Sequence, residues 1–285
     1  MSTNEMLYNI NLDQHYYHFV ILRNTRRFRL DEYWGHLGMF LKAKNPVKSY
    51  PYFEIQHRKL KTNNPYAGGE VLKRVSAPKD GNPPYHYDVF ALRVKTESDT
   101  YVVLTFPFAA LARHSVNNLM SKLNVRKGLD FQKADITSLI LAGDDGIGEG
   151  DPFRAGVVEL QVVNTKDPSL SSVTLGGDDP LKSRLYEGFL HKSITKDRKT
   201  IFPERCVLAC ELQRPRDTSG QIVGSKGNIR SRVRMDIFGN FKFYAHKGAE
   251  NIIIIPYLLR ELDAMKCLKG VSINPLLRLS EEDES

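Results

Sequence analysis

The chain has 285 residues, of which 41% are hydrophobic, enough to fill one large core or two ordinary ones. Its 41 Lys and Arg against 33 Asp and Glu give a formal net charge of +8. This balance favours anionic partners, although it falls well short of a polybasic tail. The composition indicates a globular protein and excludes a metal site built from paired cysteines, because the cysteines are only three.

The cysteines and the N-terminus bear on the compartment. Cys206 and Cys210 are four residues apart in an apolar, strand-like segment, so both would face one side of a strand and lie in the core. The N-terminus lacks a cationic start followed by an apolar run, and the apolar run at 252–259 is interrupted by Pro256 and too short to span a bilayer. We therefore expect a cytoplasmic protein that is neither exported nor inserted into a membrane.

The first half of the sequence predicts strands interrupted by two helices. Period-two alternation with aromatic and β-branched residues predicts strands at 7–12, 16–22, 52–60, 70–75, 87–95, 101–106 and 129–141. Apolar residues at helical spacing predict helices over 31–44 and 109–123. Residues 143–152 contain four glycines and no apolar periodicity, which predicts a flexible Gly/acidic linker.

The second half predicts a similar mixture. Strands are expected at 157–163, 205–212 and 271–273, with a loop over 165–177. Asp179 as N-cap and Pro180 at the first position predict the start of a helix that runs through Leu190. A last helix is expected from Pro256 to Leu268, and the acidic tail is expected to be frayed.

The order of elements is alike in the two halves, and each is close to the β-α-β-β-α-β plan of a ferredoxin-like unit with one extra strand. The predicted fold class is therefore α+β, with two tandem ferredoxin-like units and mainly antiparallel sheets. The expected divisions are an N-terminal unit 1–142, a linker 143–152, a C-terminal unit 153–280 and an acidic tail 281–285. In element order and size, such a pair resembles RNA-binding proteins built from two ferredoxin-like units, including repeat-associated RNA-processing proteins of prokaryotic immune systems. The resemblance implies RNA binding and a role in antiviral defence.

The strongest local pattern spans residues 230–246. Apolar residues alternate with charged, polar or aromatic ones on either side of Gly239-Asn240, which predicts a β-hairpin with one apolar and one basic-aromatic face. An odd-numbered turn such as 238–240, or a bulge beside Gly239, pairs Ile237 with Phe241 and keeps both faces pure. We therefore predict a bulged or three-residue turn.

The basic-aromatic side of this hairpin and the loop before it predict binding of RNA or single-stranded DNA. Cations neutralise phosphates and release counterions, while exposed rings stack on unpaired bases. The expected binding residues are Lys226, Arg230, Arg232, Arg234, Lys242, Tyr244 and His246. A solvated face that only keeps an exposed sheet soluble fits the same residues equally well.

Two other classes of function stay open. The protein could be an interaction or scaffold subunit of a prokaryotic defence system, with its sheet surface against an acidic protein partner. It could also be a ribonuclease or a metal-dependent nuclease, because the acidic loop offers oxygen ligands for a divalent ion, although not at the spacing of an EF-hand. The weak metal candidates are Asp144, Asp145, Glu149 and Asp151. No catalytic constellation, Walker loop or dinucleotide fingerprint occurs, so the sequence predicts no cofactor and leaves enzymatic activity open.

Overall fold

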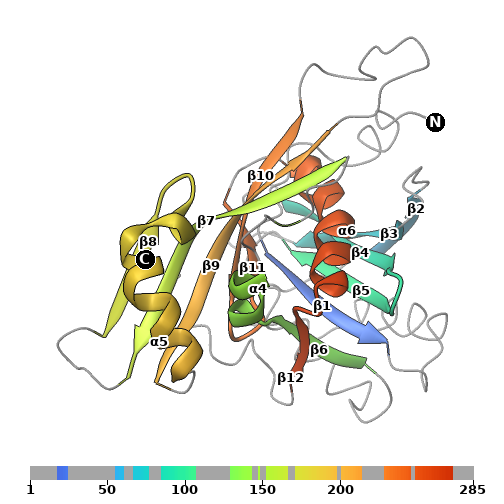
Figure 1. The fold of residues 1–285 in the computed structure, drawn as a ribbon. Coiled ribbons are helices and arrows are strands. Elements are labelled where there is room, and N and C mark those ends of the chain that lie inside the picture. Colours follow the sequence, from blue (N-terminus) through green and yellow to red (C-terminus); the bar gives the residue numbers. More distant parts are fainter. Residues whose placement is uncertain are drawn as a thin grey trace.

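The computed structural model describes residues 18–24, 55–60, 67–76, 85–106, 129–142, 147, 152–165, 171–197, 200–213, 228–244 and 248–271. Within these ranges the fold is a sheet-dominated α+β fold with few helices, as Figure 1 shows. The strands are β1 (His18–Asn24), β2 (Ile55–Leu60), β3 (Ala67–Ser76), β4 (Tyr85–Lys95), β5 (Thr100–Phe106), β6 (Leu129–Ala134), β7 (Phe153–Asn164), β8 (Ser172–Gly176), β9 (Ile201–Leu212), β10 (Ile229–Asp236), β11 (Phe241–Phe243) and β12 (Leu268–Val271). The helices are α4 (Ile136–Ala142), α5 (His191–Lys196) and α6 (Gly248–Ala264), with a 3₁₀ turn η4 (Pro180–Lys182) and a π-helix η5 (Tyr186–Leu190).

The described strands form one sheet in which the pairings are antiparallel. Their order is β2-β3-β4-β5-β1-β11-β10-β9-β7-β8, and β6 pairs with both β1 and β12. The α+β class and the antiparallel pairing predicted from sequence are thereby confirmed. Strands from both halves of the chain meet in this sheet, because β1 pairs with β11 and β6 pairs with β12. The tandem ferredoxin-like arrangement is not confirmed by this order.

Strand β1 connects strands from the first half of the chain to strands from the second half within the sheet. It pairs with β5 along one edge, and with β11 and β6 along the other. Phe19 and Ile21 point into the main core, while Val20 and Leu22 point to the opposite side and are no more than 1% exposed. A strand that is buried on both faces needs an unbroken apolar run, and the sequence Phe-Val-Ile-Leu supplies one.

The main core lies between the sheet and the helices, and α6 contacts β4, β7, β9 and β10. The core side of β9 carries Cys206, Leu208, Cys210 and Leu212, each no more than 4% exposed. The prediction that both cysteines share one buried face is therefore confirmed. Because burial raises the pKa of the Cys206 thiol, and raises that of Cys210 to about 12, these thiols stay protonated and behave as small apolar groups.

The prediction for the last helix is wrong at both ends. Helix α6 begins at Gly248 and contains Pro256 in its interior, and it ends at Ala264, before the strand β12. A proline inside a helix costs about 3 kcal/mol. The cost is offset because apolar residues at helical spacing around it are no more than 1% exposed, namely Ile254, Ile255, Leu258, Leu259 and Leu262.

Two further elements differ from the predictions. The expected strand 129–141 is the strand β6 followed by the helix α4, because Asp135 accepts hydrogen bonds from the amide and the hydroxyl of Ser138 and so caps a helix. The expected loop 165–177 contains β8, which pairs with β7 at the edge of the sheet. Its side chains alternate between exposed and buried positions, but the run is too short to stand out in the sequence.

The helix expected after Asp179 is also interrupted. Pro180 opens the turn η4 as predicted, but the side chain of Asp179 makes no capping hydrogen bond and pairs with Lys182 at 3.0 Å. The chain leaves the helix at Ser183 and continues as η5 and α5. The expected strand 7–12, the helices 31–44 and 109–123, and the acidic tail lie outside the described residues. Of the helices that the structure describes, none has the length and apolar character needed to cross a membrane.

Candidate nucleic-acid interface

The hairpin of β10 and β11 has the two faces that its alternation predicts. On β10, Val233 and Met235 are fully buried, whereas Arg230 and Arg232 are exposed and Arg234 is half-buried. On β11 the rings of Phe241 and Phe243 are 1% exposed and pack beside Phe19 of β1, with ring centroids 5.0 and 5.1 Å from it. The buried rings anchor the hairpin, and its polar side faces outward.

The turn is a three-residue loop with Gly239 at a positive φ, so the predicted length is confirmed, but the loop begins one residue earlier than expected. Met235 pairs with Phe241, and the Asp236 amide donates a 3.2 Å hydrogen bond to the carbonyl of Asn240. The loop is therefore 237–239, and the predicted pairing of Ile237 with Phe241 is wrong. Asp236 Oδ1 accepts hydrogen bonds from the amides of Phe238 and Asn240 at 2.9 and 3.0 Å, and its Oδ2 accepts one from Asn240 Nδ2 at 2.8 Å. Gly239 has a φ of 88°, a conformation that glycine adopts without strain. Because an aspartate can hold such a turn closed, the loop begins one residue before the predicted position.

Burial raises the pKa of Asp236, although the hydrogen bonds from Asn240 and Phe238 and the charge of Arg234 act in the opposite direction. The carboxyl group is therefore a structural acceptor at the base of the turn. It belongs to the scaffold that holds the outer residues in place.

Arg232 and Tyr244 lie opposite each other on the outer side of the hairpin. The Tyr244 amide donates a 2.9 Å hydrogen bond to the carbonyl of Arg232, which continues the ladder beyond β11. Arg232 is exposed and the Tyr244 side chain is 44% exposed. The structure thus brings together a guanidinium and a phenol ring on one open surface, as the sequence pattern predicts.

A second row of basic residues crosses three strands beside this pair. Arg234 of β10 is opposite Lys242 of β11, which is opposite His18 of β1. All three are half-buried, and each makes polar contacts within the molecule. The hairpin pattern could not reveal His18 as a neighbour, because the pairing of β1 with β11 joins strands that are far apart in the sequence.

Glu211 on β9 binds two arginines that reach it from the strands on either side. Its Oε2 accepts hydrogen bonds from Nε and Nη2 of Arg154, at 3.0 and 2.5 Å, and its Oε1 accepts from Nε and Nη2 of Arg230, at 3.2 and 3.1 Å. Asn228 Nδ2 donates to Oε1 at 2.6 Å. These hydrogen bonds, that of Asn228 foremost, lower the pKa of Glu211 to about 2, although burial acts in the opposite direction. Glu211 is therefore ionised, and it neutralises part of the charge of Arg230.

Sequence reasoning missed Arg154 and Glu211. Alternation along β9 places Glu211 on the side away from Cys210, so the sequence does indicate that it faces outward. Its partners depend on the order of the strands, which puts β9 between β7 and β10. Local patterns carry no information about that order.

Other predicted candidates cannot be placed. Lys226 and His246 lie outside the described residues, as do the four weak metal candidates Asp144, Asp145, Glu149 and Asp151. Ile147, inside the predicted linker, is 2% exposed and exchanges two backbone hydrogen bonds with Ala155. In the part of the chain that the structure describes, no three His, Cys, Asp or Glu residues are grouped to hold a metal ion.

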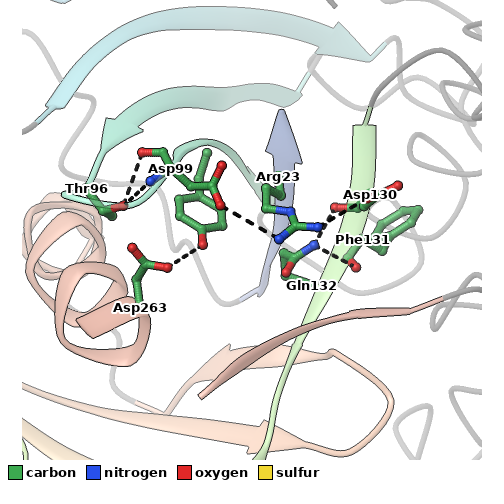
Figure 2. A network of polar contacts seen from close by, with 8 residues as sticks. Arg23, Thr96, Asp99, Asp130, Phe131, Gln132 and Asp263 are labelled. Carbon is green, nitrogen blue, oxygen red and sulfur yellow. Dashed lines mark hydrogen bonds and ion pairs between the residues drawn. The ribbon is translucent and has the colours of Figure 1, made fainter. Parts of the chain in front are cut away.

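A separate polar network lies on the core side of the sheet, near the end of α6. Figure 2 shows Arg23 of β1 between Asp99 and Asp130, whose carboxylates are 3.7 and 3.6 Å from its guanidinium. The Tyr101 hydroxyl donates a 2.6 Å hydrogen bond to Asp263 Oδ1. Burial and this bond raise the pKa of Tyr101, so the hydroxyl remains a donor. Arg23 thus links β1 to β6 and to the residue before β5, and Tyr101 links β5 to α6.

No protein-family model matches the chain, and no curated protein matches its sequence. The outer side of the hairpin is therefore the candidate site on its own geometry.

Proposed function

We propose that the protein binds RNA or single-stranded DNA through the outer side of the hairpin, named here the basic face. It consists of Arg230, Arg232, Arg234, Lys242 and Tyr244. The observation that carries the proposal is the exposed pair Arg232 and Tyr244, opposite each other on an open strand surface.

The spacing of the basic face suits a single strand. Alternate residues of a strand repeat at about 6.7 Å, so the arginines of β10 form a row of cations at that interval. This interval is comparable to the separation of successive phosphates in an extended polynucleotide. A Tyr244 ring beside the row has an open π-face for an unpaired base, and such stacking contributes about 1–3 kcal/mol per base.

Arg232 has no carboxylate partner among the described residues, which favours a nucleic-acid-binding surface over a surface that is merely solvated. Surfaces that serve only solubility intersperse charges of both signs. Glu211 meets Arg230 in this way, but Arg232 pairs with no carboxylate among the residues that the structure describes. The unpaired guanidinium beside an exposed ring is the arrangement that phosphate and base contacts need.

Binding of a labelled single-stranded oligonucleotide, followed by fluorescence anisotropy over a salt series, tests the proposal. We expect log Kobs to fall with log salt, with a slope of about −0.7 for each phosphate contact. Arg232→Glu combined with Arg234→Glu should abolish binding. The matched control is Arg184→Glu, an exposed arginine of the helical segment, which should bind as the wild type does. A response that is independent of salt, or equal binding by the double variant, contradicts the proposal.

We also propose that the protein acts in the cytoplasm. All three cysteines of the chain are buried and unbridged, which suits a reducing compartment. Fractionation of the producing cells, with detection of the intact chain, tests this. Recovery from the medium or an oxidising compartment would contradict it.

The two tandem ferredoxin-like units remain a proposal about the architecture. The antiparallel pairing and the mixture of strands and helices in each half support it. The pairing of β7 with β9 counts against it. These two strands are joined through η5 and α5 and lie next to each other in the sheet, whereas in a split β-α-β unit another strand lies between the two strands that a helix joins. Superposition of residues 1–142 on 153–280 in an experimentally determined structure decides it, because units that do not superpose exclude a duplication.

A further inference from the structure

Glu211 fixes two arginines side by side and leaves part of each guanidinium for a ligand. Arg154 and Arg230 are named here the arginine pair. Both bind Glu211 through Nε and Nη2, and Nη1 of each makes no hydrogen bond within the described part of the chain. Their side chains are 64% and 70% exposed, so the remaining donors face solvent. Two guanidiniums and one carboxylate leave a net charge of +1 at this position.

The arginine pair lies on the same face of the sheet as the basic face. The register places Arg154, Glu211 and Arg230 in one row across β7, β9 and β10. The next row along these strands holds Gly156, Ala209 and Arg232, at about 6.7 Å from the first. The two arginines of the pair are two strand spacings apart, about 10 Å. The positively charged surface therefore extends from the hairpin across β9 to β7.

We propose that the arginine pair binds a backbone phosphate of the nucleic acid held by the basic face, so that the interface extends across β9 onto β7. This inference rests on the proposed function. Planar guanidiniums bind phosphate through paired hydrogen bonds, and an arginine whose plane is already fixed has less freedom to lose on binding. Glu211 acts as a positioning residue, and Arg154 and Arg230 contact the ligand.

Between the arginine pair and Arg232, the side chains on β7 and β9 are small enough for a polynucleotide to cross this face of the sheet. Gly156 has no side chain, and Ala209 beside it has only a methyl group. A β carbon placed on Gly156 would meet no atom of the described chain within 4 Å. The protein therefore has room for a larger residue at Gly156, and that residue would occupy the space through which the ligand passes.

Three variants in the same anisotropy assay test the inference. Arg154→Ala should weaken binding of the single-stranded oligonucleotide several-fold and reduce the salt slope by about 0.7, the loss of one phosphate contact. Gly156→Val should also weaken binding, while its melting temperature stays at the wild-type value, because valine suits a strand and a β carbon at this position meets no atom of the described chain within 4 Å. Arg184→Ala is the matched control and should have neither effect.

The outcomes separate this inference from the proposed function. If Arg232→Ala weakens binding but Arg154→Ala and Gly156→Val bind as the wild type does, the interface ends at the hairpin and the inference is wrong. If the wild type shows no salt-dependent binding, the proposed function fails and the inference fails with it. Loss of affinity in both Arg154→Ala and Gly156→Val, with the control unchanged, establishes the extension onto β7.

Discussion

The hydroxyl of Tyr101 lies 2.6 Å from Asp263 Oδ1, so a hydrogen bond joins β5 to the end of α6 across 162 positions of the chain. Tyr101 is 2% exposed, so this hydrogen bond is made by a buried ring. The bond is one of the few side-chain links described between an early strand and the C-terminal helix.

Removal of this hydroxyl should destabilise the whole fold. We expect Tyr101→Phe to lower the free energy of unfolding by about 1–3 kcal/mol, because a buried hydrogen bond to a carboxylate is lost. Urea denaturation followed by circular dichroism measures the change. Tyr244→Phe is the matched control, since that ring is 44% exposed, and it should unfold at the wild-type urea concentration. Equal midpoints for Tyr101→Phe and the wild type would show that the bond contributes nothing.

The turn after β10 should depend on acceptor atoms at position 236 and not on their charge. Asp236→Ala leaves the amides of Phe238 and Asn240 without their acceptor, which should cost about 1–3 kcal/mol. Asp236→Asn keeps one acceptor oxygen, and its new amide can donate to Asn240 Oδ1, which is buried and accepts no hydrogen bond within the described residues. Because burial raises the pKa of Asp236, loss of the charge should cost little at neutral pH. Equal losses for the two variants, measured by urea denaturation, would contradict this account.

Glu211 should make stability depend on pH in the acid range. Its pKa is lowered from the ordinary 4.5 to about 2, so the folded state holds the ionised form more strongly than the unfolded chain does. The stabilisation is complete above pH 4.5 and is lost as the pH falls towards 2. Unfolding free energies measured across this window should fall more steeply for the wild type than for Glu211→Gln. Parallel curves of unfolding free energy against pH for the two proteins would refute the prediction that Glu211 causes this pH dependence. Asp135, whose pKa is also lowered, contributes equally to both.

The ring of Tyr244 should favour unpaired bases. If the proposed function is right, Tyr244→Ala should weaken binding to a single strand by about 1–3 kcal/mol, whereas Tyr244→Phe should keep most of the affinity, because stacking needs the ring and not the hydroxyl. Binding to a duplex of the same sequence should change little in either variant. A similar loss for duplex and single strand would assign Tyr244 to a role other than stacking.

Alternation along the chain was enough to predict the local geometry of the candidate site. The two faces of the hairpin follow from the sequence, because Val233 and Met235 must point away from Arg232 and Arg234 on any strand. The same reasoning placed Cys206 and Cys210 together in the core. The position of the turn was beyond it, since that position depends on the side chain of Asp236, which closes the turn one residue earlier than the apolar pattern requires.

The arrangement of strands could not be predicted in the same way. The contacts of Glu211 with Arg154 and Arg230, and the row from Arg234 to His18, need the strand order, which no local pattern contains. Helix α6 shows a related limit. The sequence places Pro256 at a helix start, but burial of the apolar residues on both sides of it outweighs the local preference.

The position of β1 also constrains how the chain reaches its folded state. This strand is made long before β11, with which part of its edge pairs. Until β11 emerges, Phe19 lacks the ring of Phe241 that packs on it. Contacts between such distant positions form slowly, and apolar strands whose edges are still unpaired are prone to aggregate. Folding of this sheet therefore concludes only after β11 has left the ribosome, and the recovery of soluble protein should depend on the rate of translation.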